Sequence, residues 1–575
     1  MKNIVYIILG LVCSQIILLA DCTTNRYTHA VFDSITVQHD VPYGEAPVWY
    51  VPYNNTTLLL DIYEPFNDGL ALRPLILWAH PGGFLLGDKT ADDIIALCDS
   101  FARKGYVTAS IGYRLGFDPL DGNSAERAVY RGTQDGRAAV RFMKQMWETY
   151  QIDTNRIFMG GSSAGGVMSL HVAYLDESER PESTFQGLIA PDLLCVDCSG
   201  NTYNHTVDLL GIVDMWGAMG DSSWRDQNDD TPVLIIHGSI DDVVPFDKGA
   251  PFGVFTMPEV HGALPIVNQS DSLNLPYTFV PFYGQNHEPH GVQNGYFNGQ
   301  EPNAYWDTIL YETNAFFYDL IRPNLYTIEG NSVVCLNDAI QTYSVAANEV
   351  NLTYCWTING GEIVAENQNE ITVAWNQTGQ GSLNLMAYNE IDCRSNEQSV
   401  LVTVLPSPVA DFFFLDFSEG TWQFVDNSVN AVTWLWDFGD GNVSEWQNPL
   451  HTYTENGSYT VSVTVTSFDG CTDVWYDQID LLSLGLNDAY GYEEAQIKVF
   501  PNPATTVVYV QNDKNMVVKD LRLFNAYGQE VWQKQESGLT NYRMINVESL
   551  KSGLYYLQIN AMNGQQSVQK LQINR

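Results

Sequence analysis

The feature that most restricts this fold is a change of pattern at Arg322-Pro323. Before it, short apolar runs that end near glycine or histidine alternate with stretches of helical periodicity; three such runs are RPLILWAH, RIFMGG and TPVLIIHG. Continuously apolar strands that alternate with helices predict a mostly parallel sheet covered by helices on both faces. We therefore expect one α/β domain over residues 27–324, with a helix at 135–150.

Beyond this point the helical periodicity disappears. In its place, short segments in which Val, Thr and Tyr alternate with other residues are separated by turns containing Gly, Asn and Asp. This pattern is typical of small immunoglobulin-like β-sandwiches. A Pro-Ser-Pro sequence at 406–408 divides the region. We expect the following arrangement after the α/β domain: sandwiches at 325–405 and 409–482, a linker at 483–495 and a last domain at 496–575.

The N-terminal segment has one lysine followed by an apolar run. This predicts a signal peptide over residues 1–22 rather than a transmembrane helix. A lipoprotein anchor at Cys22 is the alternative, which Asp21 disfavours. No other stretch is apolar for long enough to span a bilayer, so we expect no stable membrane insertion, and the signal peptide predicts export.

The charge balance bears on partners rather than on chemistry. The chain has 27 Lys and Arg against 68 Asp and Glu, which gives a formal net charge of −41. Such a surface repels phosphate backbones and anionic lipids, so we expect no nucleic-acid partner.

Nine cysteines are present, and export permits disulfides. Cys195 and Cys198 have the spacing of metal ligands, but without a second such pair a local disulfide or two free thiols are favoured over zinc. Cys335, Cys355 and Cys393 fall within one later domain, where a pair would staple a sandwich. We expect no metal site.

Residues 160–166 read GGSSAGG and lie between apolar RIFM and the helical pattern VMSLHVAYL. A strand, a sharp glycine turn and a helix form the setting of a nucleophile elbow. The frame G-x-S-x-G selects Ser163, because Gly161 and Gly165 flank it, whereas Ser162 lacks the second glycine. An ordinary Gly/Ser turn would look the same, so the prediction depends on partner residues.

Those partners should be an acid and then a histidine, in that order along the chain. Asp241 follows the predicted strand TPVLIIHG, and His287 follows the predicted strand YTFVPFYG. The frame HG-x-x-D-x-x-V-P favours Asp241 over Asp242. His290 is expected to be solvent-exposed or to support the site from outside it, and His237 is expected to make a structural hydrogen bond.

The sequence HPGGF at 80–84 follows an earlier predicted strand. Glycines let backbone N–H groups point at a developing negative charge, so Gly82, Gly83 and Ala164 are the predicted oxyanion donors. Pro81 has no N–H to offer. Phe84 and Trp216, each near a strand end, are predicted to line the acyl pocket, although such aromatics also serve as core. Residues 176–208 and 246–275 are the candidate lid or pocket segments.

Residues 54–322 resemble an α/β-hydrolase of the carboxylesterase/lipase type. The motifs that carry the resemblance are HPGGF, GYVTASIGYRLG, QDGRAAVRFMK, IDTNRIFMGGSSAGG and HGSIDDVVP, with Pro81 in place of the first glycine of the family's HGGG loop. The resemblance implies attack by Ser163 on an ester carbonyl, proton transfer to His287, orientation by Asp241 and an acyl-enzyme. It implies no metal or organic cofactor.

Three later segments also resemble known families. WDFGDG with NPLHTY and GSYTVSVTV resembles a PKD domain, and YCWTINGGEIV in the preceding segment is similar to PKD-like modules. VFPNPATT, YGQEV and GLYYLQI resemble the type A C-terminal sorting domain of type IX secretion substrates. This implies the type IX secretion machinery as a partner, export through the periplasm, and release or retention at the cell surface.

Together these features predict a secreted serine carboxylesterase. Its substrate would be a small-molecule or polymer-linked ester, such as an ester on plant or algal polysaccharide or a polyester. Two alternatives stay open: a serine peptidase of the same fold, and a surface binding protein with an inactive hydrolase domain.

Overall fold

The computed structural model describes most of the chain. The described residues are 25–48, 54–187, 190–325, 327–346, 352–418, 420–481, 497–512, 517–526, 529–535, 542–562 and 566–574. The predicted signal peptide, Cys22 and the predicted linker at 483–495 lie outside them.

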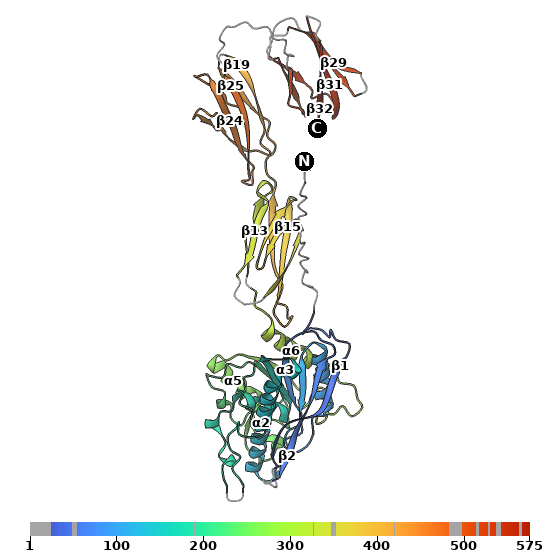
Figure 1. Ribbon diagram of the computed structural model, residues 1–575, viewed down its shortest axis with the longest axis vertical. Helices are drawn as coiled ribbons and strands as arrows, with labels where there is room; N and C mark the ends of the chain where they lie inside the picture. Colours follow the sequence, from blue (N-terminus) through green and yellow to red (C-terminus); the bar gives the residue numbers. More distant parts are fainter. Residues whose placement is uncertain are drawn as a thin grey trace, which may run out of the picture. The chain divides into compact units, whose positions relative to one another are not determined.

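An eight-stranded sheet forms the centre of the first domain (Figure 1). In spatial order its strands are β1 (Ile35–Pro47), β2 (Asn55–Pro65), β4 (Val107–Ile111), β3 (Arg73–Ala79), β5 (Ile152–Ser162), β6 (Gly211–Met215), β7 (Val233–Gly238) and β10 (Tyr277–Phe282). The sheet is parallel from β4 to β10, and β1 and β2 join it antiparallel. The predicted α/β class with a mostly parallel sheet is confirmed.

Helices cover both faces of this sheet. They are α1 (Asp92–Arg103), α2 (Gly122–Gln145), α3 (Trp147–Tyr150), α4 (Ala164–Tyr174), α5 (Ala263–Leu273) and α6 (Ala304–Ile321). Alternate residues of β3 enter opposite cores: Leu75 and Leu77 pack with α2, α4 and α5, whereas Ile76 and Trp78 pack with α1 and α6. Burial on both faces explains why this strand is a continuous apolar run. The short pair β8 (Lys248–Gly249) and β9 (Val260–His261) lies between β7 and α5.

Beyond the α/β domain, the described elements are β-strands arranged in small sheets, together with one 3-10 turn at Leu336–Asp338. The PKD-like region has β11 (Ile328–Glu329), β12 (Val333–Cys335), β13 (Ile340–Val345), β14 (Thr353–Asn359), β15 (Gly361–Asn367), β16 (Glu370–Trp375), β17 (Gly379–Tyr388) and β18 (Gln398–Leu405). The PKD region has β19 (Phe412–Ser418), β20 (Thr421–Asp426), β21 (Thr433–Asp437), β22 (Val443–Ser444), β23 (Leu450–Thr452), β24 (Gly457–Thr466) and β25 (Thr472–Leu481). The last region has β26 (Ile497–Phe500), β27 (Val507–Asn512), β28 (Val518–Asn525), β29 (Glu530–Gln535), β30 (Tyr542–Asn546), β31 (Gly553–Ala561) and β32 (Gln566–Ile573). Each region forms two sheets of three or four strands.

Two disulfides are resolved among the described residues. Cys195 pairs with Cys198, which agrees with the prediction that these residues do not form a zinc site. Cys335 pairs with Cys471, 136 residues away, rather than with a cysteine of its own domain, and Cys393 is a buried free thiol. The predicted staple by a pair among Cys335, Cys355 and Cys393 is therefore wrong for Cys335. Within the described ranges, no cluster of three His, Cys, Asp or Glu is arranged to hold a metal ion, and no helix has the length and hydropathy to cross a membrane.

The α/β domain and most of the PKD-like sandwich form one compact unit. The loop after β17 provides the link: Ile391 and Cys393 are fully buried in the core that contains α6. The Tyr318 hydroxyl donates to the Arg394 carbonyl (2.6 Å), and Asn389 donates to the Ile321 carbonyl (2.8 Å). This sandwich therefore completes one hydrophobic core of the α/β domain.

Ending the chain at residue 325 should consequently destabilise the α/β domain. The truncation uncovers the apolar surface that Ile391 and Cys393 bury, and the burial of an isoleucine side chain alone contributes roughly 1.5–3 kcal/mol. We expect its melting temperature to lie at least about 5 °C below that of a chain ending at 482, measured by scanning calorimetry. Equal melting temperatures would contradict this role of the sandwich.

Candidate active site

Ser163 lies at a strained turn between β5 and α4. Its backbone has φ 55° and ψ −114°, a conformation that costs a non-glycine residue free energy and recurs at functional sites. The turn is held by the Ser163 N–H, which donates to the Met215 carbonyl (2.9 Å). A Cβ on Gly165 would lie 2.0 Å from the Ala79 carbonyl oxygen, and one on Gly161 would lie 2.5 Å from the Gly165 carbonyl carbon. Both glycines are therefore required at this turn.

The three predicted chemical groups lie within hydrogen-bond distance of one another. His287 Nε2 is 2.9 Å from Ser163 Oγ, and His287 Nδ1 is 2.7 Å from Asp241 Oδ2. Because a carboxylate only accepts, Nδ1 carries the proton and Nε2 is free to accept from the serine hydroxyl. The neighbouring Asp242 is exposed. This arrangement can activate a serine for nucleophilic attack.

Asp241 is held by four donors. The N–H groups of Val243 and Val244 donate to its Oδ1 (2.8 and 2.9 Å), and His237 Nε2 lies 3.3 Å from its Oδ2, opposite His287. Burial of the side chain opposes its ionisation, but the hydrogen bonds from His237 and His287 outweigh this effect and lower the pKa of Asp241 below its ordinary value. The carboxylate therefore stays charged and fixed.

One predicted position, Trp216, differs from the structure, and for His290 the structure excludes one of the two predicted alternatives. Trp216 was expected to line the acyl pocket, but it is fully buried; its indole N–H donates to Ser162 Oγ (3.0 Å), and its ring contacts that of His287 edge-on. His290 is not solvent-exposed: its ring is buried and stacks between Trp216 and Trp306, and its Nε2 lies 3.7 Å from Asp93. Trp216 therefore contacts His287, and His290 packs against Trp216.

The HPGGF loop turns sharply beside the serine. Gly82 and Gly83 both have positive φ (121° and 61°). Gly83 and Ala164 line the cavity that contains Ser163, and Ala164, as the first residue of α4, has an N–H without an intrahelical partner. Gly82 does not line this cavity; its carbonyl accepts from Leu85 and Leu86 within the turn.

His80 supports this loop from below. Its Nδ1–H donates to the Pro81 carbonyl (2.7 Å), and its ring stacks on Tyr113 with 4.2 Å between ring centroids. Burial lowers the pKa of His80 to about 4, so the imidazole is neutral near pH 7. The loop is therefore positioned without an extra charge beside the serine.

The cavity at Ser163 is small and apolar, with a volume of about 100 Å³. Phe84 lines it, as predicted, and Phe252, Met257 and Val260 of the predicted 246–275 segment line it too. Phe255 points into solvent and is 93% exposed. The 176–208 segment does not line this cavity but borders a separate one through Leu193 and Leu194. Sequence reasoning missed several further lining residues, among them Phe117, Val129 and Val167.

Asp214 is buried beneath the elbow at the end of β6. Its Oδ1 accepts the Gly217 N–H (2.8 Å), while its Oδ2 has no hydrogen-bond partner among the described residues. Burial raises the pKa of Asp214 to about 7. The carboxyl is therefore neutral in the folded protein at mildly acidic pH.

Replacing Asp214 by asparagine should change how stability depends on pH. The folded pKa of about 7 lies above the unfolded value of about 4, so the neutral carboxyl stabilises the fold fully below pH 4 and loses this effect as pH rises to 7. Relative to Asp214→Asn, the wild-type free energy of unfolding should fall by up to about 4 kcal/mol over this range. Urea unfolding at pH 4, 5.5 and 7 measures it; a difference independent of pH would contradict the assignment.

Comparison with known proteins gives four matches to family models. Residues 60–229 match BD-FAE, 322–404 a PKD-like domain, 419–480 a PKD domain and 498–574 the secretion system C-terminal sorting domain. Residues 60–229 thus form an α/β-hydrolase domain, which is similar to carboxylesterases. The sorting domain indicates export of the chain to the cell surface or beyond.

The chain is similar to curated esterases over part of its length. It is 31% identical to juvenile hormone esterase of Tribolium castaneum and 32% identical to carboxylesterase 3B of Mus musculus, over 120 and 119 residues; each match covers 20% of both proteins. The chain thus spans about a fifth of the length of these relatives. Among solved structures, the apo form of Thermogutta terrifontis esterase 2 is 18% identical with a TM-score of 0.35, covering 49% of this chain and 97% of that one. A truncated carbohydrate esterase from gut microbiota is 19% identical with a TM-score of 0.31, covering 50% and 96%.

Proposed function

We propose that this chain is an exported serine carboxylesterase that hydrolyses carboxylic esters with short acyl groups. The observation that carries the proposal is the continuous hydrogen-bond chain from Ser163 through His287 to Asp241, with distances of 2.9 and 2.7 Å. The esterase relatives support the same reaction class.

In the proposed reaction, Ser163 Oγ attacks the ester carbonyl while His287 Nε2 takes its proton. Asp241 stabilises the imidazolium and holds Nδ1–H. The oxyanion accepts hydrogen bonds from the N–H groups of Gly83 and Ala164, with Gly82 as the third predicted donor. His287 then protonates the leaving alcohol, and a water molecule activated by the same imidazole hydrolyses the acyl-enzyme.

The size of the cavity restricts the acyl group. A cavity of about 150 Å³ holds one benzene molecule, so about 100 Å³ accommodates an acyl chain of only a few carbons. Phe252 helps to limit the length of the acyl chain, because its ring lies beside Gly83 in the wall of the cavity. The backbone of Phe252 has a positive φ of 58°. Acetyl to butyryl esters therefore fit without rearrangement, whereas feruloyl groups do not.

A panel of p-nitrophenyl esters tests this proposal. We expect kcat/KM to be highest for acetate to butyrate and at least about 10-fold lower for octanoate, because a longer chain meets Phe252 and Met257. Phe252→Ala should raise kcat/KM for octanoate while changing that for acetate little. Cleavage of aminoacyl-p-nitroanilides in place of esters would instead identify a peptidase, and no cleavage of either class would favour a surface binding protein.

A further inference from the structure

A second small cavity adjoins the acyl cavity that contains Ser163. Its volume is about 90 Å³, close to the 100 Å³ of the acyl cavity. Four residues line both cavities: Val129, Val167, Pro258 and Val260. Because the same side chains face both spaces, they form the boundary between the two cavities.

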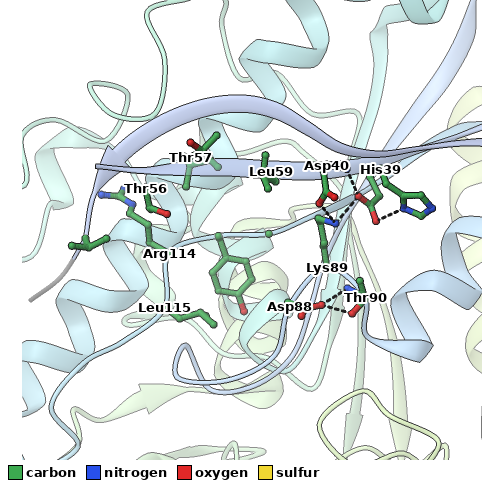
Figure 2. Close-up of a pocket in the computed structure, with 15 residues that line it drawn as sticks. His39, Asp40, Thr56, Thr57, Leu59, Asp88, Lys89, Thr90, Arg114 and Leu115 are labelled. Carbon is green, nitrogen blue, oxygen red and sulfur yellow. Dashed lines mark hydrogen bonds and ion pairs between the residues drawn. The ribbon is translucent and has the colours of Figure 1, made fainter. Parts of the chain in front are cut away.

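The largest cavity of the α/β domain has no such boundary with the acyl cavity (Figure 2). Its volume is about 680 Å³, and among the described residues none lines both of these cavities. Tyr113 lines the large cavity and Phe84 lines the acyl cavity, and their buried rings are in edge contact at 5.7 Å between centroids. These two rings block the extension of an acyl group from Ser163 in that direction.

Helices α2 and α4 carry the boundary between the two small cavities. On α4, Ala164 lines the acyl cavity, His171 lines the second cavity, and Val167 between them lines both. On α2, Ala125 lines the acyl cavity, and Val129, one turn later, lines both. Residues three or four apart lie on the same side of a helix. Each helix therefore runs past both cavities, with a valine at the point where they meet.

The inner part of the second cavity suits a hydrocarbon chain. The Tyr130 hydroxyl donates to a backbone carbonyl (2.9 Å), while His171 donates from Nδ1 to one backbone carbonyl (2.6 Å) and accepts a backbone N–H at Nε2 (3.3 Å). Burial lowers the pKa of His171 to about 4, so its ring is neutral near pH 7. Leu175 and Trp224 add apolar surface. The polar groups are thus satisfied within the protein, and the rings and the leucine present carbon atoms to a ligand.

Two carboxylates line the same cavity nearer to solvent. Glu259 is exposed and Glu126 is half-buried. They repel an acyl group that carries a second carboxylate at its far end. The cavity therefore selects an uncharged aliphatic chain over a dicarboxylic one.

We infer that Val129 and Val167 determine the acyl-chain specificity of this site, and that the cavity behind them receives the distal carbons of a saturated acyl chain when this boundary is reduced. This inference rests on the proposed esterase function. A valine side chain in a helix is nearly confined to one χ1 rotamer, so it does not swing aside for a ligand. The two valines therefore stop an acyl chain after a few carbons, and alanine at either position removes two methyl groups from the boundary.

The test measures, on the full chain, the ratio of kcat/KM for p-nitrophenyl octanoate to kcat/KM for p-nitrophenyl acetate. Val167→Ala should raise this ratio at least about 10-fold, because one methylene group in a hydrophobic pocket already changes kcat/KM by about that factor. Val172→Ala on the same helix is the matched control, since Val172 packs in the hydrophobic core of the domain. The ratio for this control should stay within about twofold of the wild type.

Filling the second cavity separates this route from other gains of octanoate activity. Glu126→Trp places a large ring in the cavity, so in the Val167→Ala background it should return the ratio to within about threefold of the wild type. Phe252→Ala enlarges the acyl cavity itself, and its gain should survive Glu126→Trp. An unchanged ratio in Val167→Ala, or a rise that Glu126→Trp does not reverse, would overturn the inference.

A binding measurement separates this inference from the proposed reaction. Should the wild-type chain hydrolyse neither ester, the proposed reaction is wrong, and calorimetric titration with octanoate and butyrate still tests the boundary. We expect Val167→Ala to tighten octanoate binding relative to butyrate at least about 10-fold, and Glu126→Trp to cancel this gain. The same ratio of the two Kd values in the wild type and in Val167→Ala would overturn the inference.

Discussion

Replacing Ser163 by alanine should lower kcat on p-nitrophenyl acetate by about 10⁴-fold or more, because the hydroxyl that forms the acyl-enzyme is removed. The cavity, the oxyanion donors and the fold remain, so KM and the melting temperature should change little. Stopped-assay kinetics on purified protein, with active-site titration of the wild type, measures the loss.

Ser162→Ala is the matched control, since it removes the adjacent hydroxyl. Ser162 Oγ accepts from the Trp216 indole N–H, so its loss leaves a buried donor unsatisfied at a cost of roughly 1–3 kcal/mol in stability. We expect a lower melting temperature and less than a 10-fold loss of kcat. A reversal of the two activity losses would assign the nucleophile to Ser162.

Asp241→Asn should lower kcat by about 10³- to 10⁴-fold. The amide no longer stabilises the imidazolium, and it can present an N–H to His287 Nδ1, which moves the ring proton to Nε2 and removes the base that Ser163 needs. Steady-state kinetics between pH 5 and 9 measures this effect, and part of the loss should be recovered at high pH, where hydroxide replaces the base.

Asp242→Asn is the control for charge and position. Asp242 is exposed, and its backbone N–H donates to Asn286 Oδ1 (2.9 Å). Its kcat should stay within about threefold of the wild type. A larger loss of kcat in Asp242→Asn than in Asp241→Asn would mean that Asp242, and not Asp241, is the acid that orients His287.

Local spacing made much of the candidate site predictable. The glycine frame around Ser163 and the strand-end positions of Asp241 and His287 are short-range patterns, and the parallel sheet brings strand ends together at one edge. The structure places these three side chains within hydrogen-bond distance, and their catalytic role stays a prediction. The buried strands were also predictable from a local pattern, because burial on both faces of the sheet produces a continuous apolar run.

The features that sequence reasoning misplaced depend on long-range packing. Trp216 follows β6 with φ 47°, which turns its ring under the elbow rather than into the cavity. For His290, burial between Trp216 and Trp306, which come from other segments of the chain, excludes solvent exposure and leaves the predicted supporting role. Helix α2 begins at Gly122 rather than at 135. Asp121 caps its first turn by accepting a hydrogen bond from the Asn123 N–H. The apolar pattern used for the prediction is clear only later in the helix.

The pairing of Cys335 with Cys471 could not be predicted from the sequence, because it too depends on long-range packing. Disulfide connectivity depends on which residues the fold brings together, and 136 residues separate these two. Spacing within one predicted domain carried no information about it.

The most direct test of the central claim is covalent labelling of the full chain with diethyl p-nitrophenyl phosphate, followed by peptide mass spectrometry. If Ser163 is activated by His287, one diethylphosphoryl group should appear on Ser163, label at that residue should be absent in Ser163→Ala, and its rate should fall at least about 10³-fold in His287→Ala. Labelling of a different residue in the wild type, or a labelling rate unchanged in His287→Ala, would contradict the account.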